Sequence, residues 1–185
     1  MDRIFATWLE RQHREALALS AASDSVAIDA EPGRYPASRY IARFHDAPTL
    51  VRRNGTVDRA SGFAAFIQFP ENYLRSVPDA AQIVNILEPD GVWHPNVVAP
   101  FICLGHIAPA TGLVELIFQV YEILNFQKLT PRDDDALNGE ACAWARQHMG
   151  EFPLSTAPLR RHAVEWSIAE ITPRAESERP SHDHT

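Results

Sequence analysis

The amino-acid sequence predicts an α+β fold with an N-terminal helix, a four-stranded antiparallel meander and C-terminal helices. Apolar residues recur every three or four positions near the start, and short β-prone runs separated by turn residues follow. A long apolar stretch and a second helical pattern come after these runs. We expect one domain over residues 1–172 and a disordered tail over 173–185, because Pro, Ser, Glu, Arg and His predominate in the tail.

The first helix is expected over residues 3–22. Its apolar residues recur at the spacing of one helical face, and charged residues occupy the other positions. The apolar set is Ile4, Phe5, Trp8, Leu9, Ala16 and Leu19. This pattern predicts an amphipathic helix that packs on the domain core.

Four strands are expected next, over residues 25–29, 40–45, 63–69 and 82–87. Turn signals separate them, namely Pro32-Gly33, Asn54-Gly55 and Pro70. Residues 88–100 contain four potential breakers, so we expect an irregular segment there. The apolar stretch over 113–126 is long enough to be a buried helix. A last helix is expected over 138–148, with Asn138 available as its N-cap.

The composition narrows the classes of partner and compartment. The net charge of −7 argues against nucleic acid or an anionic membrane as the main partner, because both reward excess Lys and Arg. The N-terminus lacks the basic start and continuous apolar stretch of a signal peptide, so we expect a cytoplasmic protein. The two cysteines, Cys103 and Cys142, are therefore expected to be free thiols.

The irregular segment and the residues just after it contain the main candidates for catalytic residues. It reads Trp93-His94-Pro95-Asn96, and Cys103-Leu104 follows seven residues after the Asn. A thiolate on an exposed, irregular segment is a good nucleophile for carrying an acyl group. A fixed amide such as that of Asn96 can stabilise the negative charge that develops when an amine attacks a thioester.

The order of these landmarks resembles the ubiquitin-conjugating enzyme family. A Phe-Pro and Tyr after the third strand, the His-Pro-Asn motif, an Ile-Cys-Leu context, a long helix and an Asp-rich loop before Leu-Asn occur in the family's order over residues 3–150. The resemblance implies a ubiquitin-conjugating-enzyme-like fold. It also implies an enzyme that accepts a ubiquitin-like modifier as a thioester on Cys103 and transfers it to an amine of a target protein, with lysine as the expected acceptor.

The resemblance also assigns roles to other residues. It implies that His94 braces the loop by hydrogen bonding and that Asp135, with Asp134 as its rival, orients the attacking amine. It implies that the first helix, through Arg3, Arg11 and Arg14, faces an activating enzyme, and that a ligase is a possible further partner. No phosphate-cradling glycine loop is present, so nucleotide-driven activation is expected in another protein, and no cofactor is expected.

Several differences from the family pattern make the chain a divergent member, similar to the stand-alone conjugating enzymes of bacterial ubiquitin-like operons. The separation from Asn96 to Cys103 is about one residue short, Gly105 stands where many members have Asp, and Ala136 replaces the loop proline. The alternative function is a catalytically inactive scaffold that binds a ubiquitin-like protein or an activating enzyme. An unrelated cysteine hydrolase remains a third reading and would need His106 as its base.

Purely structural interpretations of some Asp, Cys and His residues also remain open. The Asp133–Asp135 run is also compatible with a plain acidic turn before a helix N-terminus. Cys142 is expected to be a core or incidental residue. No metal site is expected, because the His and Cys residues lack the paired short spacing of zinc ligands.

Overall fold

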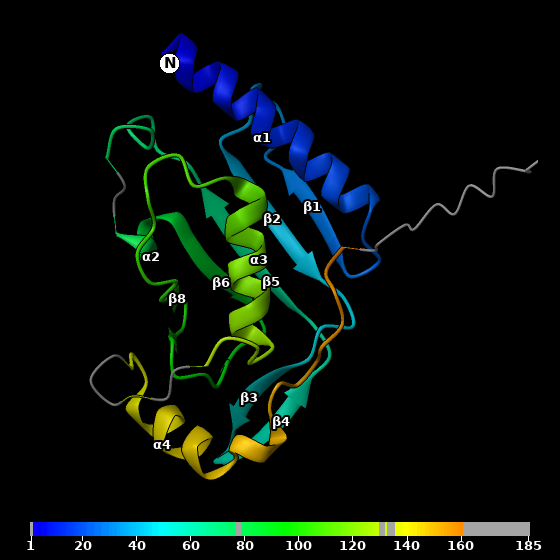
Figure 1. Ribbon diagram of the computed structural model, residues 1–185, viewed down its shortest axis with the longest axis vertical. Helices are drawn as coiled ribbons and strands as arrows, with labels where there is room; N and C mark the ends of the chain where they lie inside the picture. Colours follow the sequence, from blue (N-terminus) through cyan, green and yellow to red (C-terminus); the bar gives the residue numbers. More distant parts are fainter. Residues whose placement is uncertain (1, 77–78, 130–131, 133–135, 161–185) are drawn as a thin grey trace, which may run out of the picture.

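Helix α1 leads into a mostly antiparallel sheet, and the other long helices follow the sheet in sequence (Figure 1). The computed structural model describes residues 2–76, 79–129, 132 and 136–160. The elements are α1 (Arg3–Ala21), β1 (Val26–Ala30), β2 (Arg39–Phe44), β3 (Thr49–Arg53), β4 (Thr56–Ala60), β5 (Phe63–Gln68), α2 (Ala80–Ile83), β6 (Val84–Glu88), β7 (Val97–Val98), β8 (Phe101–Ile102), α3 (Leu113–Leu124), α4 (Gly139–Gln147) and the 3-10 turn η1 (Met149–Glu151).

The architecture confirms an α+β fold with an N-terminal helix and C-terminal helices. The predicted domain boundary at residue 172 and the tail lie outside the described residues. In the described part of the chain, no helix is long and apolar enough to cross a membrane.

The main sheet has the strand order β1-β2-β5-β6-β8-β7, and all its pairs are antiparallel. Its first four strands are the four predicted from the sequence, in the predicted meander order. The predicted strand number was wrong, because β7 and β8 extend this sheet to six strands. Each of these two strands has only two residues, so neither produces a readable alternation of apolar and polar positions.

The prediction also missed the hairpin of β3 and β4, which lies between β2 and β5 in sequence and forms a separate two-stranded sheet. Its turn is the expected Asn54-Gly55, and both residues have positive φ, as a tight hairpin requires. In β3 the first three residues, Thr49 to Val51, are buried, whereas the two arginines that follow are exposed. A run without alternation gives no period-2 signal, which explains the omission.

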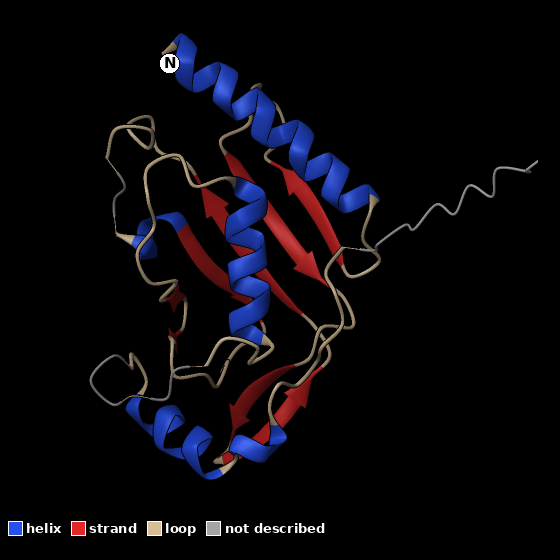
Figure 2. Ribbon diagram, in the orientation of Figure 1, coloured by secondary structure: helices blue, strands red, loops and turns tan. Residues whose placement is uncertain are grey.

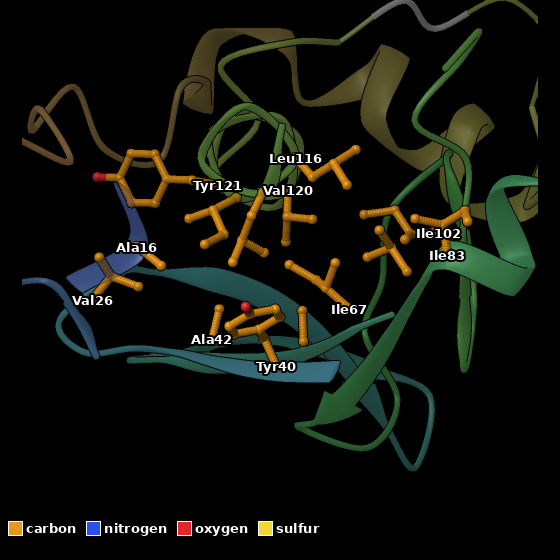
Figure 3. Packing of buried hydrophobic residues seen from close by; sticks show 14 of the residues in the cluster. Ala16, Val26, Tyr40, Ala42, Ile67, Ile83, Ile102, Leu116, Val120 and Tyr121 are labelled. Carbon is orange, nitrogen blue, oxygen red and sulfur yellow. The ribbon is translucent and has the colours of Figure 1, made fainter. Parts of the chain in front are cut away.

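The main core lies between the sheet and α3, with α1 packed beside them (Figures 2 and 3). Tyr40, Ala42 and Ile67 point from the sheet toward Leu116 and Val120 of α3 (Figure 3). All five are nearly inaccessible to solvent. Burying a large apolar side chain contributes about 1.5–3 kcal/mol, so this layer provides much of the fold's stability.

A polar contact joins α1 to α3. The buried Gln12 side chain accepts a hydrogen bond from the Leu113 backbone N–H, with a 2.8 Å separation. This N–H belongs to the first turn of α3, whose N-cap, Gly112, has no side-chain acceptor. Gln12 therefore caps α3 from a different helix and fixes the two relative to each other.

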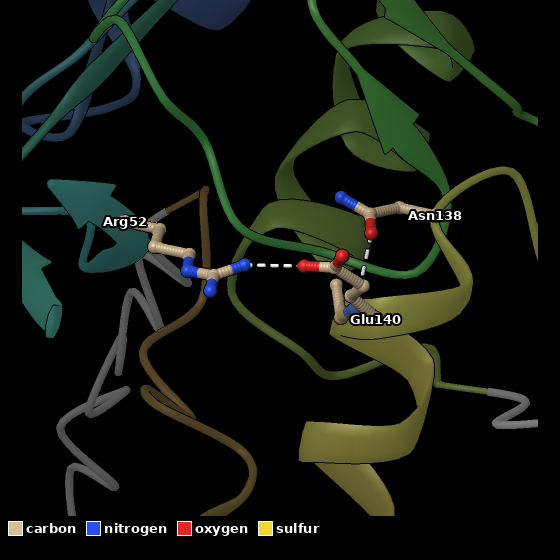
Figure 4. A network of polar contacts seen from close by, with 4 residues as sticks. Arg52, Asn138 and Glu140 are labelled. Carbon is tan, nitrogen blue, oxygen red and sulfur yellow. Dashed lines mark hydrogen bonds and ion pairs between the residues drawn. The ribbon is translucent and has the colours of Figure 1, made fainter. Parts of the chain in front are cut away.

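A second, smaller core joins the hairpin to α4. Its buried members are Leu50, Trp93, Phe126, Ala141 and Ala145. At its edge the Arg52 guanidinium lies 4.5 Å from the Trp93 ring centre and forms an ion pair with Glu140 of α4 (Figure 4). The segment that contains Trp93 and His94 therefore lies where the hairpin and α4 meet.

Candidate active site

The His-Pro-Asn turn connects β6 to β7 and is held by hydrogen bonds at both ends. The Trp93 N–H donates to the Leu50 carbonyl at 2.7 Å, which attaches the turn to the hairpin. The Val97 N–H donates to the His94 carbonyl at 3.0 Å, and the Asn96 N–H donates to His94 Nδ1 at 3.0 Å. The imidazole thus holds the turn together as a hydrogen-bond acceptor.

The His94 ring is fully buried and packs edge-on against Phe126, with the ring centres 4.3 Å apart. Burial lowers the pKa of His94 to about 3, because the charged imidazolium is poorly solvated there. Since Nδ1 accepts a hydrogen bond, the neutral ring carries its proton on Nε2, which has no hydrogen-bond partner among the described residues. A neutral ring enclosed in this way is suited to bracing the turn and unsuited to proton transfer with a substrate.

Cys103 follows β8 directly and is held against Asn96. The Cys103 N–H donates to the Asn96 carbonyl at 2.8 Å, and Asn96 Nδ2 donates to the Cys103 carbonyl at 3.3 Å. Pairing of β7 with β8, in which Val97 is opposite Ile102, sets this register. An amide has two N–H donors, so one remains for another acceptor. Cys103 is a free, partly exposed thiol.

A groove of about 700 Å³ contains Cys103. It extends from α2 past β8 to Leu137, two residues before α4. The lining residues are Asp79, Ala80, Ala81, Val98, Phe101, Ile102, Cys103, Gly105, His106, Ile107, Pro109 and Leu137. Val98, Phe101 and Leu137 are each 48% exposed, which leaves a mainly apolar wall open to solvent beside the thiol. An extended, partly apolar chain can therefore approach Cys103 along this groove.

The segment after the acidic run approaches the His-Pro-Asn turn. The Asn138 N–H donates to the Pro95 carbonyl at 2.9 Å, while its side chain caps α4 by accepting from the Ala141 N–H at 3.0 Å (Figure 4). Leu137, one residue earlier, lines the Cys103 groove. The predicted amine-orienting residues, Asp134 and Asp135, lie outside the described residues.

The arginines predicted to contact an activating enzyme lie on the solvent side of α1. Arg3, Arg11 and Arg14 are exposed, and Arg11 forms an ion pair with Glu15 at 3.7 Å. At roughly 100° per residue the three fall within about 80° of one another around the helix. This helix packs at the β1 end of the sheet, whereas β8 and Cys103 are near the other end (Figure 1). The structure therefore separates the arginines from the thiol.

The remaining Cys and His candidates differ in accessibility. Cys142 is fully buried in α4, as expected for a core residue. His106 is exposed and lines the groove, and no hydrogen bond links it to the Cys103 thiol in the part of the chain that is described. Among those residues no group of three His, Cys, Asp or Glu side chains is arranged to hold a metal ion.

Sequence reasoning missed the supports of this site. The hydrogen bond from Asn138 to Pro95 joins residues 43 positions apart, and that from Trp93 joins a loop residue to Leu50 of β3, also 43 positions away. Asn138 was predicted as an N-cap, but nothing local indicates its second contact. Phe126 carries one signal, its place at the end of an apolar helix, yet its packing on His94 depends on the tertiary fold.

The three landmark residues His94, Asn96 and Cys103 thus form one connected unit beside an open groove. The resemblance to ubiquitin-conjugating enzymes rests on the order of several sequence landmarks that include these three residues, and their contacts describe what the unit can do chemically. No protein-family model matches the chain, and no curated protein matches it either.

Proposed function

We propose that this chain is a ubiquitin-like-protein conjugating enzyme, which carries a modifier on Cys103 as a thioester and passes it to an amine of a target protein. One observation carries the proposal: the side chain of Asn96 is held against the backbone of Cys103, at the edge of an open groove. A nucleophile and a neighbouring fixed amide donor are the two groups that acyl transfer from a thioester requires.

Charging is a thiol exchange. The Cys103 thiol loses its proton, and the thiolate attacks the carbonyl carbon of the modifier's thioester on an activating enzyme. The new C–S bond forms as the old one breaks, and the activating enzyme's thiolate leaves. The partial exposure of Cys103 and the open groove suit an approach by a protein tail.

Discharge forms an amide. A neutral amine attacks the thioester carbon, negative charge develops on the carbonyl oxygen, and the Cys103 thiolate then leaves. The attached nitrogen gives its extra proton to the thiolate or to water. The Asn96 amide has two N–H donors. One is bonded to the Cys103 carbonyl, and the second is available to the thioester carbonyl oxygen. A donor of this kind typically lowers the activation free energy by about 3 kcal/mol. Asp135, or Asp134, is proposed to orient the amine.

The buried imidazole of His94 has a positioning role in this scheme. Its Nδ1 holds the Asn96 N–H, and its ring remains neutral at physiological pH because burial lowers its pKa to about 3. A positive charge two residues from Asn96 is thereby avoided. The exposed arginines of α1 are proposed to face the activating enzyme, far from the chemistry.

The test is a charging experiment in lysate of the native host with ATP, read on non-reducing and reducing gels. We expect a larger species that disappears on reduction and that becomes a reduction-resistant ester in Cys103→Ser. Cys142→Ala is the matched control, since its thiol is fully buried, and it should charge like the wild type. Absence of any adduct in a lysate shown to contain an activating enzyme and its modifier would favour the inactive scaffold.

A further inference from the structure

His106 lies in the same groove as Cys103, three residues further along the chain. Gly105, between them, has a φ of +78°, a left-handed conformation that turns the backbone sharply. Leu104 packs against the main core and Ile107 is 6% exposed, so the chain is anchored on both sides of this turn. The exposed imidazole of His106 is therefore presented at the groove by a fixed backbone.

Few described residues that line this groove can ionise. They are Asp79, Cys103 and His106. The Asp79 carboxylate caps α2 by accepting a hydrogen bond from the Ala81 N–H at 3.3 Å. The His106 imidazole has no hydrogen bond or ion pair to any described residue, so both ring nitrogens are available to a ligand.

We propose that His106 is the general base of the discharge step, an assignment that rests on the proposed function. One ring nitrogen of His106 takes a proton from the incoming ammonium group. The free amine then attacks the thioester carbon, the C–N bond forms, and the C–S bond breaks with its electron pair going to Cys103 sulfur. The attached nitrogen loses its second proton to the departing Cys103 thiolate or to water, which leaves the neutral amide. The imidazolium returns its proton to solvent.

The chemistry favours an imidazole over a carboxylate for this task. A free lysine amine has a pKa of about 10.4, so at neutral pH it arrives protonated. A carboxylate is a weak base and, by its charge, favours the protonated amine. Imidazole titrates near neutrality, which makes it the better acceptor of a proton at working pH. The mainly apolar walls of the groove further disfavour the charged amine.

The experiment measures how fast a preformed thioester is discharged. A synthetic peptide ending in Gly-Gly is supplied as its mercaptoethanesulfonate thioester, exchanged onto Cys103 and separated from excess reagent. Discharge is then followed by mass spectrometry with free lysine and, separately, with hydroxylamine, which is already a free base at neutral pH. The proteins compared are wild type, His106→Gln and His45→Gln, since His45 is an exposed histidine on another part of the surface.

His106→Gln should slow discharge to lysine by about 10²-fold at pH 7.5 and leave discharge to hydroxylamine within about twofold of wild type. The defect should shrink as the pH rises toward the pKa of the amine, and His45→Gln should resemble wild type throughout. Equal losses with both nucleophiles would indicate a structural role and overturn the proposal, as would unchanged lysine discharge. Wild-type discharge no faster than that of a free-cysteine thioester would overturn the conjugating function itself.

Discussion

Asn96 and Cys103 hold each other through two hydrogen bonds of opposite direction. The Cys103 N–H donates to the Asn96 carbonyl at 2.8 Å, and the Asn96 side chain donates back to the Cys103 carbonyl at 3.3 Å. The first bond involves only backbone atoms, so it survives any substitution of the Asn96 side chain that leaves the backbone in place. This separates the catalytic role of the amide from the structural role of the turn.

Asn96→Ala should leave charging of Cys103 nearly unchanged and slow discharge to lysine by about 10²-fold, because thiolate attack on a thioester has a lower barrier than amine attack and depends less on the amide donor. The lost side-chain hydrogen bond should lower the unfolding free energy by about 1 kcal/mol. Rates come from single-turnover discharge and stability from urea titration. Asn85→Ala is the matched control, since Asn85 Nδ2 also donates to a backbone carbonyl, at 3.1 Å, and is also part-buried. Equal discharge by the two variants would contradict the role of Asn96.

Acid should destabilise the protein through His94. Its folded pKa of about 3 lies below the unfolded value of about 6.5, so below pH 6.5 the unfolded chain binds the extra proton. The unfolding free energy attributable to this group is therefore present above pH 6.5 and falls as the pH falls toward 3. The loss amounts to about 2 kcal/mol between pH 7 and pH 5.

His94→Asn tests this assignment, because Asn can still accept from the Asn96 N–H but does not titrate. The variant should be less stable at pH 7, where ring packing on Phe126 is lost, yet its stability should depend less on pH between 7 and 5. Urea titrations across this range give the comparison. His45→Gln should keep the full wild-type slope, and a His94→Asn slope equal to wild type would contradict the assignment.

Gly91 sets the distance between the hairpin and the segment before His94. A Cβ at this position would lie 2.8 Å from the Arg52 carbonyl oxygen, and the Gly91 carbonyl accepts from the Arg52 N–H at 2.7 Å. Gly33 has nearly the same φ, +77° against +75°, but has open space around its Cβ position. Gly91→Ala should therefore cost at least about 1 kcal/mol more in unfolding free energy than Gly33→Ala, which carries only the conformational penalty.

The same pair of variants should differ in discharge rate, since displacement of the hairpin moves the Trp93 backbone that it anchors. Thermal or urea unfolding and single-turnover discharge are the two readouts. Equal unfolding free energies for Gly91→Ala and Gly33→Ala would show that the hairpin can move away from a Cβ at position 91 without loss of stability, and would contradict the prediction.

Reversing the charges of Arg3, Arg11 and Arg14 to Glu should slow charging by an activating enzyme several-fold and leave intrinsic discharge to lysine unchanged. The reason is that the three side chains share an exposed face of α1 at the sheet end away from Cys103. The control carries Glu at Arg34, Arg53 and Arg59, which are exposed on other parts of the chain, so its net charge is the same. Charging rates that match between the two triple variants would remove the proposed contact.

The sequence predicted most long elements because each depends on interactions between near neighbours. The apolar spacing around Trp8 and Leu9 indicated α1 to within one residue of its observed end, and Asn138 is the N-cap of α4 as expected. The positive φ of Asn54 and Gly55 agrees with the predicted turn. The two-residue strands were missed because they are too short to show an alternation, and the hairpin was missed because β3 does not alternate.

The sequence by itself determined the order of the helices and main strands, and it identified Cys103, Asn96 and His94 as one group of candidate site residues. Only the tertiary structure decided the environment of that group. It buries His94 against Phe126, attaches the turn to the hairpin through Leu50, and places His106 in the groove of the thiol. Periodicity and turn chemistry act over a few residues, whereas desolvation, groove shape and access depend on contacts between segments far apart in the chain.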